Sequence, residues 1–241
     1  MVNSDALVSC TVAGYLMLVK ILCEFMRHRK PVHVLHLYRL HNAALALGSM
    51  ALLSAILSEV IPYIFTHGLF SAICNETAWT QRLERYYTIN YYTKYWELLD
   101  TAFIVMMKKP FARMHLFHHS TVLVLCYTQL KAETPMSWVI IVNNLFVQVP
   151  MYYYYFATAD GRYLWWKQYL TQLQIVQIFV DMLVIFFGSY NHIVFTYAHD
   201  WLPVVGDCAI SDAAALFSSV LMTTFFILFL NFYCWLYVKR R

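Results

Sequence analysis

The chain has 241 residues, of which 61% are hydrophobic and only 12% are charged, and its formal net charge is +4. A soluble domain carries about a quarter charged residues, so this composition excludes an ordinary water-soluble fold. The chain contains no GxGxxG, P-loop or HExxH motif and no segment that resembles a nucleic-acid-binding module. We therefore predict an all-α polytopic membrane protein and no nucleic-acid partner.

Seven apolar stretches follow one another along the chain, and each is about as long as a helix that crosses a bilayer. The first stretch has no positive region before it and no small-residue cleavage site after it, so we expect a retained helix and not a cleaved signal peptide. Little of the chain is left for a soluble domain, and residues 1–241 are expected to form one membrane-embedded domain. The predicted spans are 6–26, 40–64, 91–107, 114–130, 137–157, 168–190 and 212–238.

The basic residues between these spans predict the orientation of the chain. Twelve of the 17 Lys and Arg residues, including 239–241, fall at one set of alternate span ends, and three fall at the other. Because basic residues accumulate on the cytosolic side, we expect a cytosolic C-terminus and a lumenal N-terminus. The sequon Asn75-Glu76-Thr77 would then be lumenal, and the sequence leaves open whether Asn75 is glycosylated.

Ionisable residues in the third and fourth spans are the strongest functional signal, because a charge inside a membrane is costly. His115, His118 and His119 share one helical face, since their spacings are three and four residues. Lys94, Glu97 and Thr101 follow the same spacing in the third span, with Asp100 beside them. These charges are expected to pair with one another or with the histidines, and a purely structural ion-pair network is the alternative interpretation.

The fifth and sixth spans each carry a polar stripe at helical spacing. In the fifth span the stripe consists of Asn144, Gln148, Tyr152 and Tyr155, and Pro150 predicts a kink. In the sixth it consists of Thr171, Gln174, Gln177 and Asp181, which could equally be polar contacts between helices. Four consecutive helices with one polar face each predict a bundle around a polar cavity. Histidine serves as base, acid, nucleophile or metal ligand, so this pattern alone leaves the chemistry open.

Four sequence boxes together resemble the ELO-type very-long-chain fatty acid elongases, and most closely their fungal branch. The boxes are KxxExxDT (94–101), HxxHH (115–119), NxxVxVxMYYYY (144–155) and TQLQIVQ (171–177). The resemblance extends from about His41 to the C-terminus. It implies that six helices enclose an acyl tunnel while the first helix packs outside, in the membrane of the endoplasmic reticulum.

The activity that this resemblance implies is that of a 3-oxoacyl-CoA synthase, an acyltransferase. An acyl-CoA condenses with malonyl-CoA, CO₂ and CoA are lost, and the acyl chain grows by two carbons, with no resident cofactor or metal. The fungal-like boxes favour saturated, very long chains of the kind used in sphingolipid biosynthesis. The reductases and the dehydratase of the elongation cycle are implied as partners, besides membrane lipid. The sequence leaves chain length and a homodimeric state open.

The resemblance also implies roles for individual residues. His118 is the expected acyl-accepting nucleophile, and His115 and His119 are the expected acid, base and orienting groups. The residues expected to support them or to bind substrate are Lys94, Glu97, Asp100, Asn144, Gln148, Tyr152, Tyr155, Gln174 and Gln177. Gln148 departs from the family, which has histidine there, and an amide cannot carry a proton or an acyl group. We nevertheless expect it to face the cavity near His118, where its amide could bond an imidazole or a substrate carbonyl.

Three alternatives to an active elongase remain open. Gln148 alone motivates a catalytically impaired homologue that binds acyl chains without turnover. A di-iron desaturase or hydroxylase also uses histidine boxes, but the other seven histidines form no second box. A receptor or transporter would explain the span count without the histidine cluster.

The six cysteines contain no CxxC pair, so a zinc site is not expected. In the predicted topology only Cys74 and Cys208 lie in lumenal connections, where disulfides form. We expect them to be bonded, joining the connections after the second and sixth spans over the closed end of the tunnel.

Overall fold

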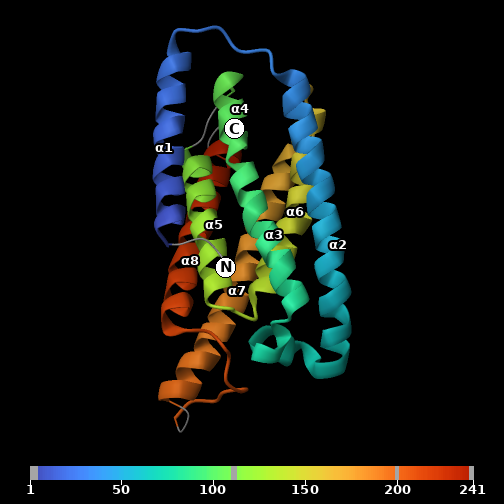
Figure 1. The fold of residues 1–241 in the computed structure, drawn as a ribbon, viewed down its shortest axis with the longest axis vertical. Helices are drawn as coiled ribbons and strands as arrows, with labels where there is room; N and C mark the ends of the chain where they lie inside the picture. Colours follow the sequence, from blue (N-terminus) through green and yellow to red (C-terminus); the bar gives the residue numbers. More distant parts are fainter. Residues whose placement is uncertain (1–4, 110–112, 199–200, 239–241) are drawn as a thin grey trace.

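The computed structural model describes residues 5–109, 113–198 and 201–238, so the C-terminal basic residues 239–241 lie outside the described residues. The described part is helical and elongated (Figure 1). Its elements are α1 (Asp5–Arg27), α2 (Leu35–Cys74), the 3₁₀ turn η1 (Glu76–Ala78), α3 (Gln81–Glu97), α4 (Leu99–Met106), α5 (Arg113–Lys131), α6 (Ser137–Ala157), α7 (Lys167–Tyr197), α8 (Asp212–Tyr233) and the π-helical segment η2 (Cys234–Val238).

Helices α1, α5 and α6 begin and end within one residue of the predicted stretches, whereas two other helices are longer than predicted. Helix α2 has 40 residues and, at 1.5 Å per residue, would be about 60 Å long if straight. It is interrupted at Gly68, whose φ of 83° suits a residue without a Cβ. The third predicted span is in fact two helices, α3 and α4, separated at Leu98. Its start was placed too late because the first turns of α3 are polar.

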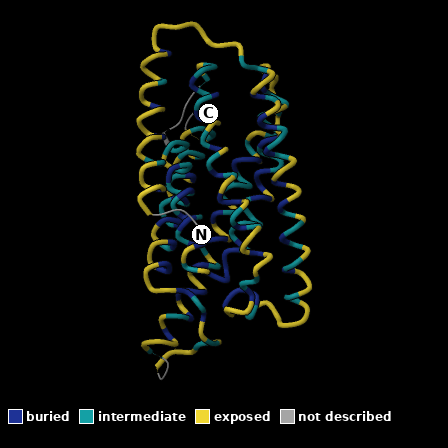
Figure 2. Tube along the Cα trace, viewed as in Figure 1, coloured by how far each residue is buried: buried dark blue, intermediate teal, exposed yellow. Residues whose placement is uncertain are grey.

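Four helical segments of the described part are long and apolar enough to cross a membrane. They are Asp5–Arg27, Leu35–Cys74, Lys167–Tyr197 and Asp212–Val238. Large apolar side chains of these helices are exposed, such as Phe65 at 86% and Leu216 at 69%. Exposed positions follow the outer sides of the helices (Figure 2). An outer surface covered by large apolar side chains is the reverse of a soluble bundle, and the chain is a multi-pass membrane protein.

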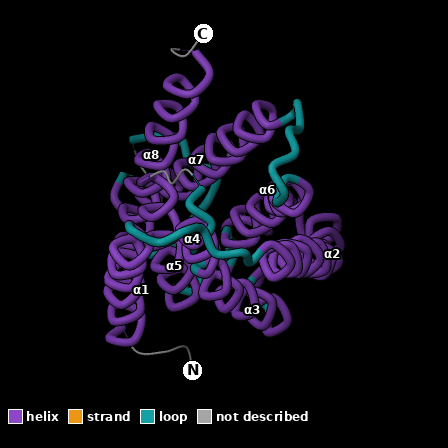
Figure 3. Tube along the Cα trace, turned by 90° about the horizontal axis from the view of Figure 1, so that it is seen from above, coloured by secondary structure: helices purple, strands orange, loops and turns teal. Residues whose placement is uncertain are grey.

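Helix α1 lies at the edge of the bundle, as both the side view and the view from above show (Figures 1 and 3). It contacts α4 and α5, whereas α2 packs on α6, α7 on α8 and α3 on α5. Polar contacts help to hold α1 in place. The Tyr15 hydroxyl lies 2.5 Å from Thr101 Oγ1, and Lys131 Nζ donates to Asp5 at 2.8 Å.

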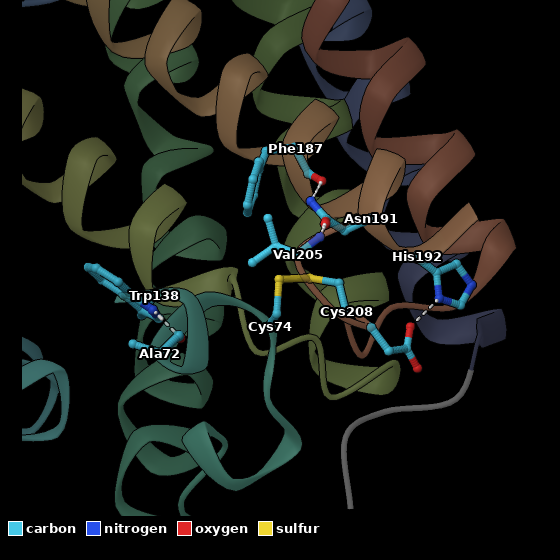
Figure 4. Close-up of a disulfide and its surroundings, with 9 residues drawn as sticks. Ala72, Cys74, Trp138, Phe187, Asn191, His192, Val205 and Cys208 are labelled. Atoms are coloured by element: carbon cyan, nitrogen blue, oxygen red, sulfur yellow. Dashed lines mark hydrogen bonds and ion pairs between the residues drawn. A yellow bond between two sulfur atoms is a disulfide. The ribbon is translucent and has the colours of Figure 1, made fainter. Parts of the chain in front are cut away.

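A disulfide between Cys74 and Cys208 closes one end of the bundle (Figure 4). It is the expected pair, and it joins the end of α2 to the connection between α7 and α8, with the two Cα atoms 4.2 Å apart. The Ala209 amide donates to the Cys74 carbonyl at 2.8 Å. Asn191 accepts from the Val205 amide at 3.0 Å. The connection is therefore held by backbone hydrogen bonds as well as by the covalent bond.

Apolar packing beneath this disulfide is tight. A Cβ at Gly188 would lie 2.2 Å from Met136 Cε and 3.4 Å from Cys208 Sγ, so any side chain there would require the end of Met136 to move. Met136 is 1% exposed, and it belongs to an apolar core with Leu125 and Ile185. The end of the bundle that carries the disulfide is thus filled by side chains. We call it the disulfide half.

Candidate active site

A cavity of about 400 Å³ opens in the other half of the bundle, and we call it the histidine cavity. Side chains from α2 to α8 line it. Eleven of the twelve predicted catalytic and supporting residues are among the lining residues: Glu97, Asp100, His115, His118, His119, Asn144, Gln148, Tyr152, Tyr155, Gln174 and Gln177. The twelfth, Lys94, is buried at 3% exposure behind Glu97.

The three histidines stand on the first two turns of α5 and form one cluster. The ring centroids of His115 and His119 are 4.3 Å apart, and those of His118 and His119 are 5.5 Å apart. The His118 ring also packs against Phe225 and Phe229 of α8, at centroid distances of 5.1 and 5.8 Å. His118 therefore combines contact with an apolar wall and access to the cavity. This is a suitable place for a reactive imidazole beside an apolar chain.

Glu97 is held by a cation on its own helix and by an amide from α6. Lys94 Nζ donates to Glu97 Oε1 at 2.8 Å and to Asn144 Oδ1 at 2.7 Å. Gln148 Nε2 donates to Glu97 Oε1 at 2.8 Å. We call Lys94, Glu97 and Gln148 the Glu97 unit.

Gln148 lines the cavity, as expected from its helical register. Its two hydrogen bonds differ from the expectation of a bond to an imidazole. The amide nitrogen donates to Glu97, and the amide oxygen accepts from Ser49 Oγ at 3.0 Å. No periodic pattern in α2 marks Ser49 as a partner of Gln148, so this bond could not be expected from the sequence. Gln148 thus joins the carboxylate of α3 to α2.

Asp100 is also held by hydrogen bonds, in this case from α2 and α6. His41 Nε2 lies 2.5 Å from Asp100 Oδ1, and the Tyr152 hydroxyl donates to Asp100 Oδ2 at 3.0 Å. Asp100 and His41 are each 5% exposed. We call His41, Asp100 and Tyr152 the Asp100 unit.

The wall formed by α6 and α7 carries a third buried carboxyl group. Asp181 is fully buried, and it accepts from Asn143 Nδ2 at 2.7 Å and from Gln177 Nε2 at 2.9 Å. Because the Gln177 amide nitrogen donates to Asp181, this contact fixes how Gln177 presents its amide to the cavity. Gln174 donates instead to Met151 Sδ at 3.3 Å.

Two lysines line the cavity where α4, α6 and α7 reach the same end of the bundle. These are Lys109, in the connection after α4, and Lys167, at the start of α7. Lys109 Nζ lies 4.6 Å from the centroid of the Tyr38 ring. Burial lowers the pKa of Lys109, and the negative charge of Asp160 opposes that shift. A cavity with cations at this end suits a substrate with an anionic head group.

Sequence reasoning missed His41, Ser49, Lys109 and Lys167 as parts of this site. His41 and Ser49 are single polar residues in a long apolar helix, and no periodic stripe marks them. The two lysines were interpreted only as orientation signals. Their sequence positions beside the ends of polar-faced helices were the available clue.

Comparison with known proteins identifies the family. The model of the "ELO: GNS1/SUR4 family" matches residues 1–241, and the chain belongs to this family. "Putative fatty acid elongase 1" of Schizosaccharomyces pombe is 42% identical over 237 residues, which are 98% of this chain and 70% of the relative. "Putative fatty acid elongase 2" of the same organism is 36% identical over 238 residues, 99% of this chain and 65% of the relative. "Fatty acid elongase A" of Dictyostelium discoideum is 32% identical over 232 residues, 94% of this chain and 81% of the relative.

Proposed function

We propose that this chain is a condensing enzyme of fatty acid elongation, which joins an acyl-CoA to malonyl-CoA and yields a 3-oxoacyl-CoA. The observation that carries the proposal is the convergence of His115, His118 and His119 with two bonded carboxylates on one cavity. Family membership and the named elongases among the relatives support it. The acyl chain would lie in the bundle and the CoA head group near Lys109 and Lys167.

The proposed first step transfers the acyl group to His118. An imidazole nitrogen attacks the thioester carbonyl carbon, the C–S bond breaks, and the displaced proton of the imidazole goes to the CoA thiolate. His115 and His119 lie close enough to carry that proton. The apolar wall of Phe225 and Phe229 would keep water from the acyl-imidazole.

The proposed second step forms the new carbon–carbon bond. Malonyl-CoA loses CO₂, and the electron pair of the broken bond remains as a thioester enolate. The enolate carbon attacks the acyl carbon, the acyl–nitrogen bond breaks, and the imidazole recovers a proton from solution. The sum consumes one proton and releases CO₂ and CoA, without a resident cofactor.

The same proposal includes the setting of the enzyme. Seven membrane spans would place six helices around the acyl tunnel and α1 outside, in the endoplasmic reticulum membrane. The mouth with Lys109 and Lys167 would face the cytosol, and the Cys74–Cys208 disulfide would face the lumen, where thiols oxidise.

An elongation assay tests the proposal. Purified protein in lipid nanodiscs is given labelled malonyl-CoA and acyl-CoAs of graded length, and the products are resolved by chain length. We expect 3-oxoacyl products two carbons longer than the substrate, with stoichiometric CO₂. A condensing activity would be contradicted if the protein consumed no malonyl-CoA with any saturated or unsaturated acyl-CoA.

Gln148 favours a second candidate, a homologue that binds acyl chains with impaired turnover. Proton transfer is worth about 10²–10⁴-fold where it is used, so Gln148→His would raise turnover by such a factor if a proton carrier were needed there. We propose instead an active enzyme, because the amide already holds Glu97 and Ser49. Gln148→His should then change kcat less than about tenfold. An inactive natural protein with strong activity in Gln148→His would establish the impaired homologue.

The di-iron alternative receives no structural support of its own. Among the described residues, no group of three or more His, Cys, Asp or Glu side chains is arranged to hold a metal ion. Metal analysis of purified protein, together with the assay above, separates this alternative from condensation.

A further inference from the structure

The Glu97 unit and the Asp100 unit have the same construction, one helical turn apart. Each has a carboxylate that lines the histidine cavity and a buried basic side chain bonded to it. Each carboxylate also accepts a hydrogen bond from α6, from Gln148 in one unit and Tyr152 in the other. They differ in the basic residue, which is a lysine on the same helix for Glu97 and a histidine from α2 for Asp100.

His41 occupies a position from which it can act only through Asp100. Its side chain is 4% exposed and is not among the described residues that line the cavity. Its ring packs against Phe103 and Trp96, with centroids 5.0 and 6.0 Å away. These contacts fix the ring so that Nε2 meets Asp100 Oδ1.

The direction of the Tyr152 hydrogen bond decides what Tyr152 offers to the cavity. A phenol has one O–H donor and lone pairs that accept. While its proton is donated to Asp100, Tyr152 can only accept hydrogen bonds from the cavity. The hydrogen bond from His41 satisfies one oxygen of Asp100, and a carboxyl group that lost this partner could carry a proton itself. It could then donate to Tyr152 and leave the phenol proton free to point into the cavity.

We propose that His41 is a positioning residue: by holding Asp100 as a carboxylate, it keeps Tyr152 a hydrogen-bond acceptor on the cavity wall. The proposal rests on the proposed condensation for its effect on turnover. The state of Asp100, however, can be measured without turnover. A failure of the proposed condensation can therefore be distinguished from a failure of the proposed role of His41.

The first measurement is infrared spectroscopy of the full chain in nanodiscs. In His41→Gln we expect a carboxylic-acid C=O stretch that the natural protein lacks, and we expect Asp100→Asn in the same background to remove it. His36→Gln is the matched control, because it is the same change at an exposed position of α2. No new band in folded His41→Gln would overturn the proposal, whether or not the protein turns over substrate.

The second measurement is steady-state kinetics. Loss of an outer partner of a site residue costs about 10–100-fold, and we expect that loss in kcat for His41→Gln, with KM for malonyl-CoA nearly unchanged. Because His41 acts through Tyr152, His41→Gln should have little further effect in a Tyr152→Phe background. A merely structural role predicts less folded protein with normal kcat per folded molecule in either background, and that result would overturn the proposal. An inactive natural protein would refute the proposed condensation alone, and the infrared band would still decide the role of His41.

Discussion

The two halves of this bundle use their interiors in opposite ways. Around the histidine cavity, the buried ionisable side chains of Lys94, Glu97 and Asp100 form hydrogen bonds with neighbouring helices. In the disulfide half, the interior is filled by side chains such as Met136 and Ile185, and a covalent bond ties the connections. A polar cavity adds little stability, because buried ion pairs seldom repay their desolvation. The comparison indicates that the disulfide half stabilises a bundle whose other half holds the polar cavity.

The change with the largest expected effect is His118→Ala. It should abolish condensation, by more than about 10³-fold, because no neighbour replaces a lost nucleophile. The protein should remain folded, since the site contributes little to stability. Turnover is measured with labelled malonyl-CoA, and the exposed His36→Ala is the matched control. Substantial activity in His118→Ala would remove His118 from the nucleophile role.

Removing the disulfide should lower the stability of the protein and leave its turnover nearly unchanged. Cys74 and Cys208 are 134 residues apart in sequence, and loss of such a bond typically costs about 2–5 kcal/mol. We expect Cys74→Ala with Cys208→Ala to lower the thermal midpoint while kcat per folded molecule changes little. The exposed free Cys10, changed to Ala, provides the control. A loss of kcat at full stability would show that the two halves are not separate in function.

Gly188→Ala tests the same separation with a smaller change. The new Cβ would meet Met136 Cε at 2.2 Å, and overpacking of this kind costs about 1–3 kcal/mol. Thermal unfolding should show the loss, and shortening Met136 to Ala in the same chain should recover part of it. Gly14→Ala is the control, because a Cβ there meets no atom within 4 Å. Equal effects of the two single changes would contradict the packing account.

The smallest effect is expected at the mouth of the cavity. Lys109→Gln or Lys167→Gln removes one cation from the lining. Since a partly exposed charge contributes about 1 kcal/mol or less, KM for malonyl-CoA should rise several-fold and kcat should stay nearly constant. The increase in KM of each variant should become smaller as salt is added. Lys20→Gln, on the exposed face of α1, is the control.

The sequence predicted the cavity half better than the contacts within it. Spacings of three and four placed His115, His118 and His119 on one face, and the polar stripe of α6 faces the cavity as expected. Periodicity describes one helix at a time, however. It could not show that Ser49 and His41 of α2 would bond Gln148 and Asp100.

Helix ends were predicted well where an apolar stretch ended at a polar turn, as for α6. They were missed where a helix continued through polar residues, as at the start of α3, or ran beyond the apolar stretch, as in α2 and α7. The break at Leu98 was also missed, because the helical spacing of Lys94, Glu97 and Thr101 continues across it.

The most direct test of the central claim is to trap the acyl group on the enzyme. Purified protein is incubated with a labelled acyl-CoA in the absence of malonyl-CoA, and free CoA and peptide masses are measured. The account predicts one CoA released per active site, an acyl adduct on the peptide that contains His118, its loss in His118→Ala, and its discharge into product when malonyl-CoA is added. Full condensation activity with no adduct, or with an adduct on another residue that turns over at the same rate, would contradict it.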